Sequence, residues 1–274
     1  MKKLITRTAT GIVLVLVILA AIFAGQYSYA VLFLLILSGG LFEFSKLYKK
    51  SEIKPNVWLS YMISFLLFGI SFFVAKGILG TSYFLLLFPF FLIIMAAELY
   101  RKKQKPLENI AVTIFSIVYL AIPISLLNFL VFTEILPGSN FSPKLLIALF
   151  AIIWTYDSGA YLFGVSMGKH RLFERISPKK SWEGAIGGTF TALLAAYIIS
   201  NLIPEIQIIH WMAISILTVV SSTYGDLTES MFKRYFGIKD SGQILPGHGG
   251  VLDRFDSLLF AVPVIVLYLK IIIE

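Results

Sequence analysis

Two pairs of carboxylates near the C-terminus have a spacing that suits metal chemistry. Asp226 and Glu229 are three residues apart, and Asp253 and Asp256 repeat that spacing. Residues three apart on a helix share a face, and carboxylates so close repel unless a cation lies between them. Mg²⁺ takes oxygen ligands and leaves positions for substrate phosphates. Two interpretations stay open: a magnesium site at Asp226, Asp253 and Asp256, or a helix cap at Asp253 or Asp256 with Glu229 paired to Lys233.

A glycine-rich stretch lies between these pairs. Residues 246–250 read PGHGG and precede a predicted helix start. Glycine lets backbone approach a ligand closely, and helix starts offer free N–H groups to phosphates. The cations around it are Lys233, Arg234, Lys239 and Arg254. Phosphate binding is therefore the favoured interpretation, with His248 donating to a phosphate, moving a proton or holding the loop.

A second basic segment, residues 177–184, reads SPKKSWEG. The proline fits the first turn of a helix with Ser177 as its N-cap, so a structural role is available. Lys179 and Lys180 at a positive helix end would also suit a triphosphate. The small residues that follow indicate a helix-packing surface, and they are Gly184, Gly187 and Gly188.

The block from Ser230 to Asp256 resembles the signature of phosphatidate cytidylyltransferases, the CDP-diacylglycerol synthases. The matching residues are Ser230, Lys233, Arg234, Lys239, Asp240, Gly242, Leu245, Pro246, His248, Gly249, Gly250, Asp253, Arg254, Phe255 and Asp256. Residues 177–184 are similar to a second motif of the family, which usually has Thr where Ser181 stands. That departure keeps the hydroxyl group.

The resemblance implies that CTP and phosphatidic acid give CDP-diacylglycerol and pyrophosphate, with Mg²⁺ as cofactor and K⁺ as a candidate second cation. The attacking oxygen belongs to an ionised phosphate, so the site needs positioning and charge stabilisation rather than a strong base. The implied catalytic residues are Asp226, Asp253, Asp256, Lys239, Asp240 and His248. The implied substrate-binding residues are Ser177, Lys179, Lys180, Lys233, Arg234, Gly249, Gly250 and Arg254. The implied metal ligands are Asp226, Asp253 and Asp256, with Asp157 as a further candidate whose rival role is pairing with Tyr156 or a lysine. A homodimer is an expectation from the resemblance alone.

The composition is that of a membrane protein. Of 274 residues, 58% are hydrophobic and only 14% are charged, which excludes an ordinary soluble domain. Cysteine is absent, so disulfides and thiolate metal sites are excluded. Apolar segments of about 20 residues are long enough to cross a ~30 Å hydrocarbon core as helices. We predict an all-α polytopic membrane protein with spans at 8–24, 28–46, 56–75, 82–99, 109–131, 144–163, 183–203, 208–231 and 254–272.

The distribution of cations predicts orientation. With the N-terminus in the cytoplasm, all but three of the 23 Lys and Arg residues fall on the cytoplasmic side, the exceptions being Lys76, Lys144 and Lys270. The net charge of +8 therefore reflects topology and attraction to anionic lipid, and no nucleic-acid partner is expected. We expect the plasma (inner) membrane of a prokaryotic cell, with the active site on its cytoplasmic face.

The polar residues change in kind along the chain. Residues 1–142 are predicted to form a bundle of five spans, in which Glu43 and Glu98 are interpreted as snorkelling or paired with a lysine. Residues 143–274 are predicted to form a catalytic region of four spans with cytoplasmic loops 164–182 and 232–253. The polar segments of this region are expected to converge on one cavity.

Other functions share parts of this sequence pattern. A related enzyme that uses CTP with another lipid, such as a polyprenol kinase or an ether-lipid cytidylyltransferase, shares the same chemistry. A CDP-alcohol phosphotransferase is disfavoured because its Asp-Gly-x2-Ala-Arg motif is absent. A transporter of anions would place polar residues near the midplane in both halves, whereas here they gather at one face. A membrane scaffold would leave the block from Ser230 to Asp256 unexplained.

Overall fold

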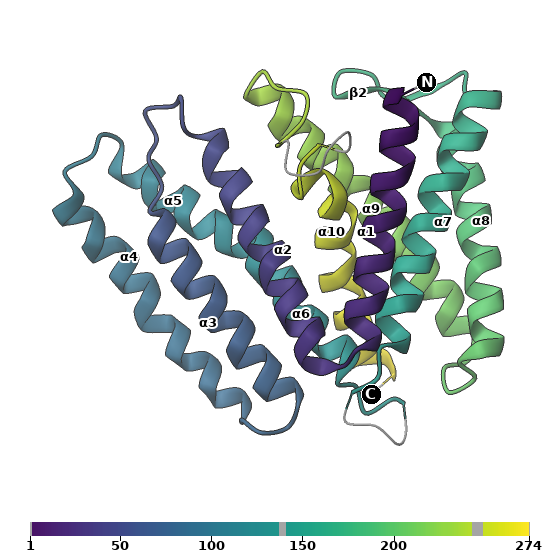
Figure 1. Ribbon diagram of the computed structural model, residues 1–274, viewed down its shortest axis with the longest axis horizontal. Helices are drawn as coiled ribbons and strands as arrows, with labels where there is room; N and C mark the ends of the chain where they lie inside the picture. Colours follow the sequence, from purple (N-terminus) through teal and green to yellow (C-terminus); the bar gives the residue numbers. More distant parts are fainter. Residues whose placement is uncertain (1, 137–140, 243–248, 274) are drawn as a thin grey trace. The chain divides into compact units, whose positions relative to one another are not determined.

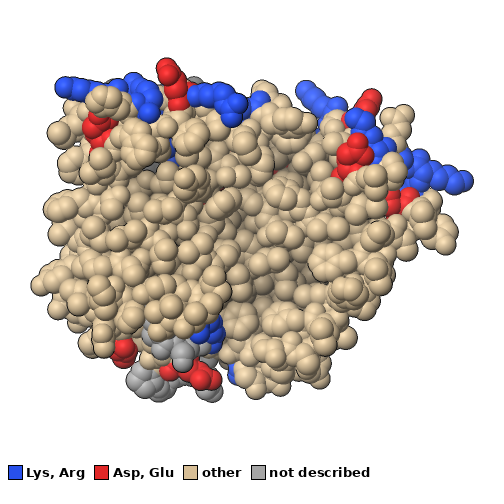
Figure 2. Space-filling model, turned by 180° about the vertical axis from the view of Figure 1, so that it is seen from behind, with Lys and Arg blue, Asp and Glu red and all other residues tan. Residues whose placement is uncertain are grey.

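The computed structural model describes residues 2–136, 141–242 and 249–273, and most of these are helical. Eight helical segments of this described part are long and apolar enough to cross a membrane. They are Gln26–Leu47, Val57–Ala75, Thr81–Arg101, Pro106–Val131, Lys144–Met167, Trp182–Leu202, Ile208–Tyr235 and Leu252–Ile272. Thr10–Phe23, in the first predicted span, is a shorter apolar helix. On the face shown in Figure 2, the Lys, Arg, Asp and Glu side chains lie toward the top and the bottom of the view, and a broad band without charged side chains lies between them. The predicted all-α polytopic fold is confirmed.

The chain forms two compact units. Unit 1 contains Met1–Phe132 and Asp240–Phe255, and unit 2 contains Thr133–Lys239 and Asp256–Glu274. The predicted domain boundary at residue 142 stays a prediction.

Unit 1 is a bundle of helices, in which α3 contacts α2, α5 and α6, while α4 contacts α5 (Figure 1). Its elements are α1 (Lys2–Phe23), α2 (Gln26–Leu47), α3 (Val57–Ala75), the 3₁₀ helix η1 (Thr81–Leu87), α4 (Phe88–Arg101), α5 (Pro106–Ser116), the π-helical turn η2 (Ile117–Ala121) and α6 (Ile122–Val131). The turn η2 stands just before Pro123, near the start of α6. Proline has no backbone N–H to donate and its ring crowds the preceding turn, which accounts for the local π geometry inside one span.

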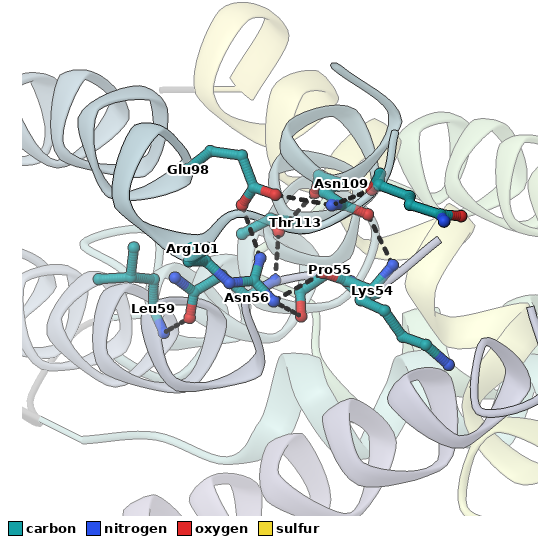
Figure 3. Close-up of polar contacts among 9 residues, drawn as sticks. Lys54, Pro55, Asn56, Leu59, Glu98, Arg101, Asn109 and Thr113 are labelled. Atoms are coloured by element: carbon teal, nitrogen blue, oxygen red, sulfur yellow. Dashed lines mark hydrogen bonds and ion pairs between the residues drawn. The ribbon is translucent and has the colours of Figure 1, made fainter. Parts of the chain in front are cut away.

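A buried polar network holds one end of unit 1 together (Figure 3). The Glu98 carboxylate accepts from Arg101 Nη1 and from Asn109 Nδ2, both at 2.6 Å. Asn109 Oδ1 in turn accepts from the Lys54 backbone N–H at 2.6 Å, and Thr113 Oγ1 accepts from the Asn56 N–H at 2.8 Å. The interpretation of Glu98 as snorkelling or paired with a lysine is wrong. Its partners are an arginine and a buried amide, which satisfy a carboxylate that has little access to water.

Unit 2 contains the remaining helices and a small hairpin. Its elements are α7 (Lys144–Met167), β1 (Arg171–Phe173), β2 (Ser177–Ser181), α8 (Trp182–Leu202), α9 (Ile208–Tyr235), α10 (Leu252–Tyr268, in this unit from Asp256 onward) and the π-helical turn η3 (Leu269–Ile273). Helices α7 and α8 approach very closely. A Cβ added at Gly188 would lie 2.8 Å from the Tyr156 carbonyl oxygen, and one at Gly184 would lie 2.7 Å from the Ala160 carbonyl oxygen. The predicted small-residue packing surface is confirmed.

The start of α8 differs from the prediction. Ser177 is not a helix N-cap, because Ser177–Ser181 is strand β2, paired antiparallel with β1. The N-cap is Ser181, whose Oγ accepts from the Gly184 N–H at 3.1 Å. Pro178 is tolerated because a two-stranded sheet consists only of edge strands, where a missing N–H costs little. The predicted loop 164–182 therefore contains a hairpin that presents its lysines from a strand.

Candidate active site

Unit 2 contains a cavity of about 470 Å³ at the junction of α7, the hairpin and the first turn of α8. Its lining residues are Tyr156, Asp157, Ala160, Tyr161, Gly164, Val165, Arg171, Leu172, Pro178, Lys179, Lys180, Ser181, Gly184 and Ala185. Small residues on both helices leave this space open, because α7 contributes Ala160 and Gly164 while α8 contributes Gly184 and Ala185. The volume suits part of a drug-sized or nucleotide ligand.

The cavity carries a positive cluster. Arg171 comes from β1, and Lys179 and Lys180 come from β2. The N-terminal end of α8, which is the positive end of the helix dipole, also lines the cavity at Gly184. The guanidinium group of arginine and the ammonium group of lysine commonly bind phosphates, so this part of the cavity is suited to a polyphosphate. Ser177, predicted to bind substrate, does not line this cavity.

Two side chains link the cavity to α9. Lys180 Nζ forms an ion pair with the Asp226 carboxylate. Tyr156 and Thr223 hydroxyls hydrogen-bond at 2.5 Å. The structure thus brings together Asp157, Lys179, Lys180 and Asp226, which lie on three separate elements of unit 2. The Tyr156 hydroxyl, one of the alternative partners for Asp157 beside a lysine, hydrogen-bonds to Thr223 of α9, and the role of Asp157 stays a prediction.

A buried carboxylate stands near this pair. Asp256 is only 7% exposed, and the carboxylates of Asp226, Glu229 and Asp157 lie close enough to repel its charge. Its Oδ1 accepts from the adjacent Ser257 N–H at 2.7 Å. Glu229 forms an ion pair with Lys233, its i+4 neighbour, as the sequence allowed. A close approach of α9 and α10 places these acids together, since a Cβ at Gly225 would lie 2.5 Å from the Asp256 carbonyl oxygen.

The carboxylates of unit 2 suit an ion that takes few protein ligands, as Mg²⁺ does, rather than an ion held entirely by protein side chains. Within residues 2–136, 141–242 and 249–273, no three His, Asp or Glu side chains form a group that could hold a metal ion. Mg²⁺ commonly uses one or two carboxylates and completes its coordination with water and substrate phosphates. Asp226 and Asp256 supply two such carboxylates, and the burial of Asp256 among other acids is a reason for a cation to bind there.

The signature residues of unit 1 organise a turn around Asp253. Asp253 Oδ2 accepts from the Ser241 N–H at 3.0 Å, the Ser241 hydroxyl at 3.0 Å and the Gly250 N–H at 2.7 Å. Gly249 has a φ of 84°, a left-handed conformation that glycine adopts without strain. The described contacts of Asp253 therefore hold backbone that precedes α10, and the expected metal role of Asp253 stays a prediction.

Glu43 of α2 also contacts this turn, which the sequence did not reveal. Its Oε2 accepts from the Leu252 N–H at 3.0 Å and the Ser241 hydroxyl at 3.3 Å. The interpretation of Glu43 as snorkelling or paired with a lysine is wrong, because the side chain is fully buried and its donors are a hydroxyl and a backbone amide. A glutamate inside an apolar span was the available signal.

The roles of the remaining predicted site residues stay predictions. Arg234, Lys239, Asp240 and Arg254 are exposed side chains. His248 lies outside the described residues. Arg171 and Tyr161 were not predicted as site residues, since Arg171 was counted only as a cation of the cytoplasmic loop and no pattern signalled the hairpin that brings it to the cavity.

Comparisons with known proteins agree with the resemblance. The model of a family described as the cytidylyltransferase family matches residues 5–272. A phosphatidate cytidylyltransferase of Haemophilus influenzae is 52% identical over 124 residues, which cover 43% of this chain and 43% of that protein. One from Staphylococcus aureus strain COL is 48% identical over 118 residues, covering 42% and 45%. One from Staphylococcus epidermidis is 35% identical over 193 residues, covering 69% and 67%. The chain thus spans less than half the length of the first two relatives.

Proposed function

Because the chain belongs to the cytidylyltransferase family, we propose that it transfers a cytidylyl group from CTP to phosphatidic acid, giving CDP-diacylglycerol and pyrophosphate. The relatives named above carry this activity in their names. The observation that carries the proposal in the structure is the cavity of unit 2, where three cations face a polyphosphate-sized space and one of them pairs with Asp226.

The cations bind the phosphates of CTP. Arg171, Lys179 and Lys180 offset the charge of the triphosphate and fix its orientation. Lys180 exchanges its partner, from the Asp226 carboxylate to a phosphate oxygen. This exchange leaves Asp226 able to take another cation.

The chemical step is a substitution at phosphorus. An oxygen of the lipid phosphate attacks the α-phosphorus of CTP, the bond from that phosphorus to the bridging oxygen of the β-phosphate breaks, and pyrophosphate leaves with the electron pair. The lipid phosphate is already ionised, so no side chain has to remove a proton. The cations stabilise the charge that grows on the leaving pyrophosphate.

Asp226 and Asp256 are the proposed holders of Mg²⁺, with Asp253 and Asp157 as further candidate ligands and K⁺ as a candidate second cation. When bound, Mg²⁺ supplies charge neutralisation at the phosphates. The burial of Asp256 beside the carboxylates of Asp226, Glu229 and Asp157 supports this assignment, because a bound cation would offset their repulsion.

The proposed location is the plasma membrane of a prokaryotic cell, with the site on the cytoplasmic face. The apolar helices and the bacterial relatives support a bacterial membrane protein. The one-sided distribution of Lys and Arg supports the orientation. A homodimer is proposed from the resemblance alone, and mass measurement of the protein in nanodiscs tests it.

The direct test uses purified protein in detergent with CTP, Mg²⁺ and labelled phosphatidic acid. We expect labelled CDP-diacylglycerol and one pyrophosphate for each CTP consumed. A parallel reaction with polyprenol or an ether-lipid phosphate separates the alternatives, because preference for either would refute phosphatidic acid as the substrate. No lipid-linked product with any acceptor would refute the cytidylyltransferase assignment.

A further inference from the structure

Glu43 places a fully buried carboxylate in unit 1, far from the cavity residues in sequence. The side chain is 0% exposed, and its neighbours on α2 include the buried apolar residues Leu41 and Phe44. Burying a carboxylate is costly unless donors compensate it. Among the described residues, Oε2 accepts from the Leu252 N–H and lies within hydrogen-bond distance of the Ser241 hydroxyl, whereas Oε1 has no hydrogen-bond partner. Apolar packing alone therefore does not explain why a glutamate occupies this buried position.

One reason is the start of α10. Leu252 is the first residue of that helix, and its N–H is one of the backbone donors that a helix cannot satisfy internally. Glu43 Oε2 accepts from it at 3.0 Å across 209 positions of sequence. A negative charge at a helix N-terminus is also favoured by the helix dipole. Glu43 therefore caps α10 from another helix.

A second reason is the fit between Glu43 and two signature glycines. A Cβ added at Gly242 would lie 2.1 Å from Glu43 Oε1, and one added at Gly250 would lie 2.3 Å from Glu43 Oε2. Neither glycine has a left-handed φ, so backbone conformation does not explain them. Gly242 and Gly250 thus leave room for the Glu43 carboxylate, a role separate from letting the backbone approach a phosphate.

A third link joins Glu43 to Asp253. The Ser241 hydroxyl lies 3.3 Å from Glu43 Oε2 and 3.0 Å from Asp253 Oδ2. A hydroxyl has one proton, so it donates to one carboxylate at a time. The position of Asp253, one turn before Asp256 on α10, is therefore coupled to the position of Glu43.

We propose that Glu43 is a positioning residue for cytidylyl transfer: it fixes the start of α10 and the Ser241–Gly242 and Gly250 backbone, and through them the signature aspartates. It does not contact substrate. This assignment gives the second membrane helix a part in the reaction, and it rests on the proposed function above.

The experiment compares Glu43→Gln with Glu52→Gln, a matched control. Glu52 is an exposed glutamate of unit 1 whose ion pair with Lys105 lies on the surface. Because a positioning residue acts in the transition state more than in substrate binding, we expect Glu43→Gln to lower kcat about tenfold or more with the KM for CTP within about threefold. Hydrogen exchange of the peptide 249–256 should rise in Glu43→Gln and not in Glu52→Gln, with the rest of unit 1 unchanged.

A compensating pair keeps the proposal testable if Glu43→Gln does not fold. Gly242→Ala alone should lower kcat, because the new Cβ collides with Glu43 Oε1. Shortening the acid in the double variant Glu43→Asp with Gly242→Ala should restore part of that loss. Additive losses in this pair, or a Glu43→Gln enzyme with wild-type kcat and exchange, would overturn the inference. A wild-type protein that forms no CDP-diacylglycerol would instead refute the proposed function, while the exchange measurement would still report on the cap.

Discussion

Removal of the Lys180 side chain is the sharpest perturbation of the cavity. In unit 2 this lysine both lines the cavity and pairs with Asp226. Lys180→Ala takes away a proposed partner of the CTP phosphates and leaves Asp226 without this cation. We expect the KM for CTP to rise and kcat to change less, because the lost contact is already present when CTP binds.

The magnitude follows from two opposing contributions. A hydrogen bond from a charged donor to a phosphate contributes about 1.5–3 kcal/mol. Against this, the pair with Asp226 must break when CTP binds. Its side chains are 31% and 29% exposed, and ion pairs in contact with solvent contribute about 0.5–1 kcal/mol. The net loss is about 1–2 kcal/mol, which corresponds to a rise in KM of about 5- to 30-fold.

The assay measures initial rates of CDP-diacylglycerol formation at varied CTP and saturating phosphatidic acid. Lys144→Ala is the control, because it removes another lysine of unit 2 whose partner, Glu205 at 3.7 Å, is not a cavity residue. A KM for CTP within about twofold of the wild type in Lys180→Ala, with normal kcat, would refute the role of Lys180. An equal rise in the Lys144→Ala control would show that net charge, rather than the cavity, determines CTP binding.

Three further predictions concern the metal, the helix packing and the buried network. Asp256→Asn should lower turnover below about 1% of the wild type at any Mg²⁺ concentration while the thermal midpoint in detergent is retained, and normal turnover would refute the metal role. Gly188→Ala should destabilise unit 2 by about 1–3 kcal/mol, because its Cβ would meet the backbone of α7. Gly69→Ala, with nothing within 4 Å, is the control and should not lower the thermal midpoint. Asn109→Ala should destabilise unit 1 by about 2–4 kcal/mol, because Glu98 and two backbone groups lose a buried partner; an unchanged thermal midpoint would contradict this.

Much of the fold was predictable from local patterns. Apolar runs of membrane length predicted the helices, and closely spaced small residues in α8 predicted a helix-packing surface; only the structure shows that its partner is α7. The error at Ser177 has a local origin, because proline after serine suits both a helix start and an edge strand. What decided between them was the pairing of β2 with β1, whose residues carry no strong strand pattern. Arg171 was missed as a cavity residue for the same reason.

The sequence by itself determined that the chain is a membrane protein of this family, since composition and a contiguous signature depend only on local order. Only the tertiary structure decided which distant groups two of the acids contact: Lys180 for Asp226, and Ser241 for Asp253. The clearest case is Glu43, which spacing could not connect with Leu252 because 209 positions separate them. A buried carboxylate is stable only where donors reach it, and which donors do so is set by how distant helices pack.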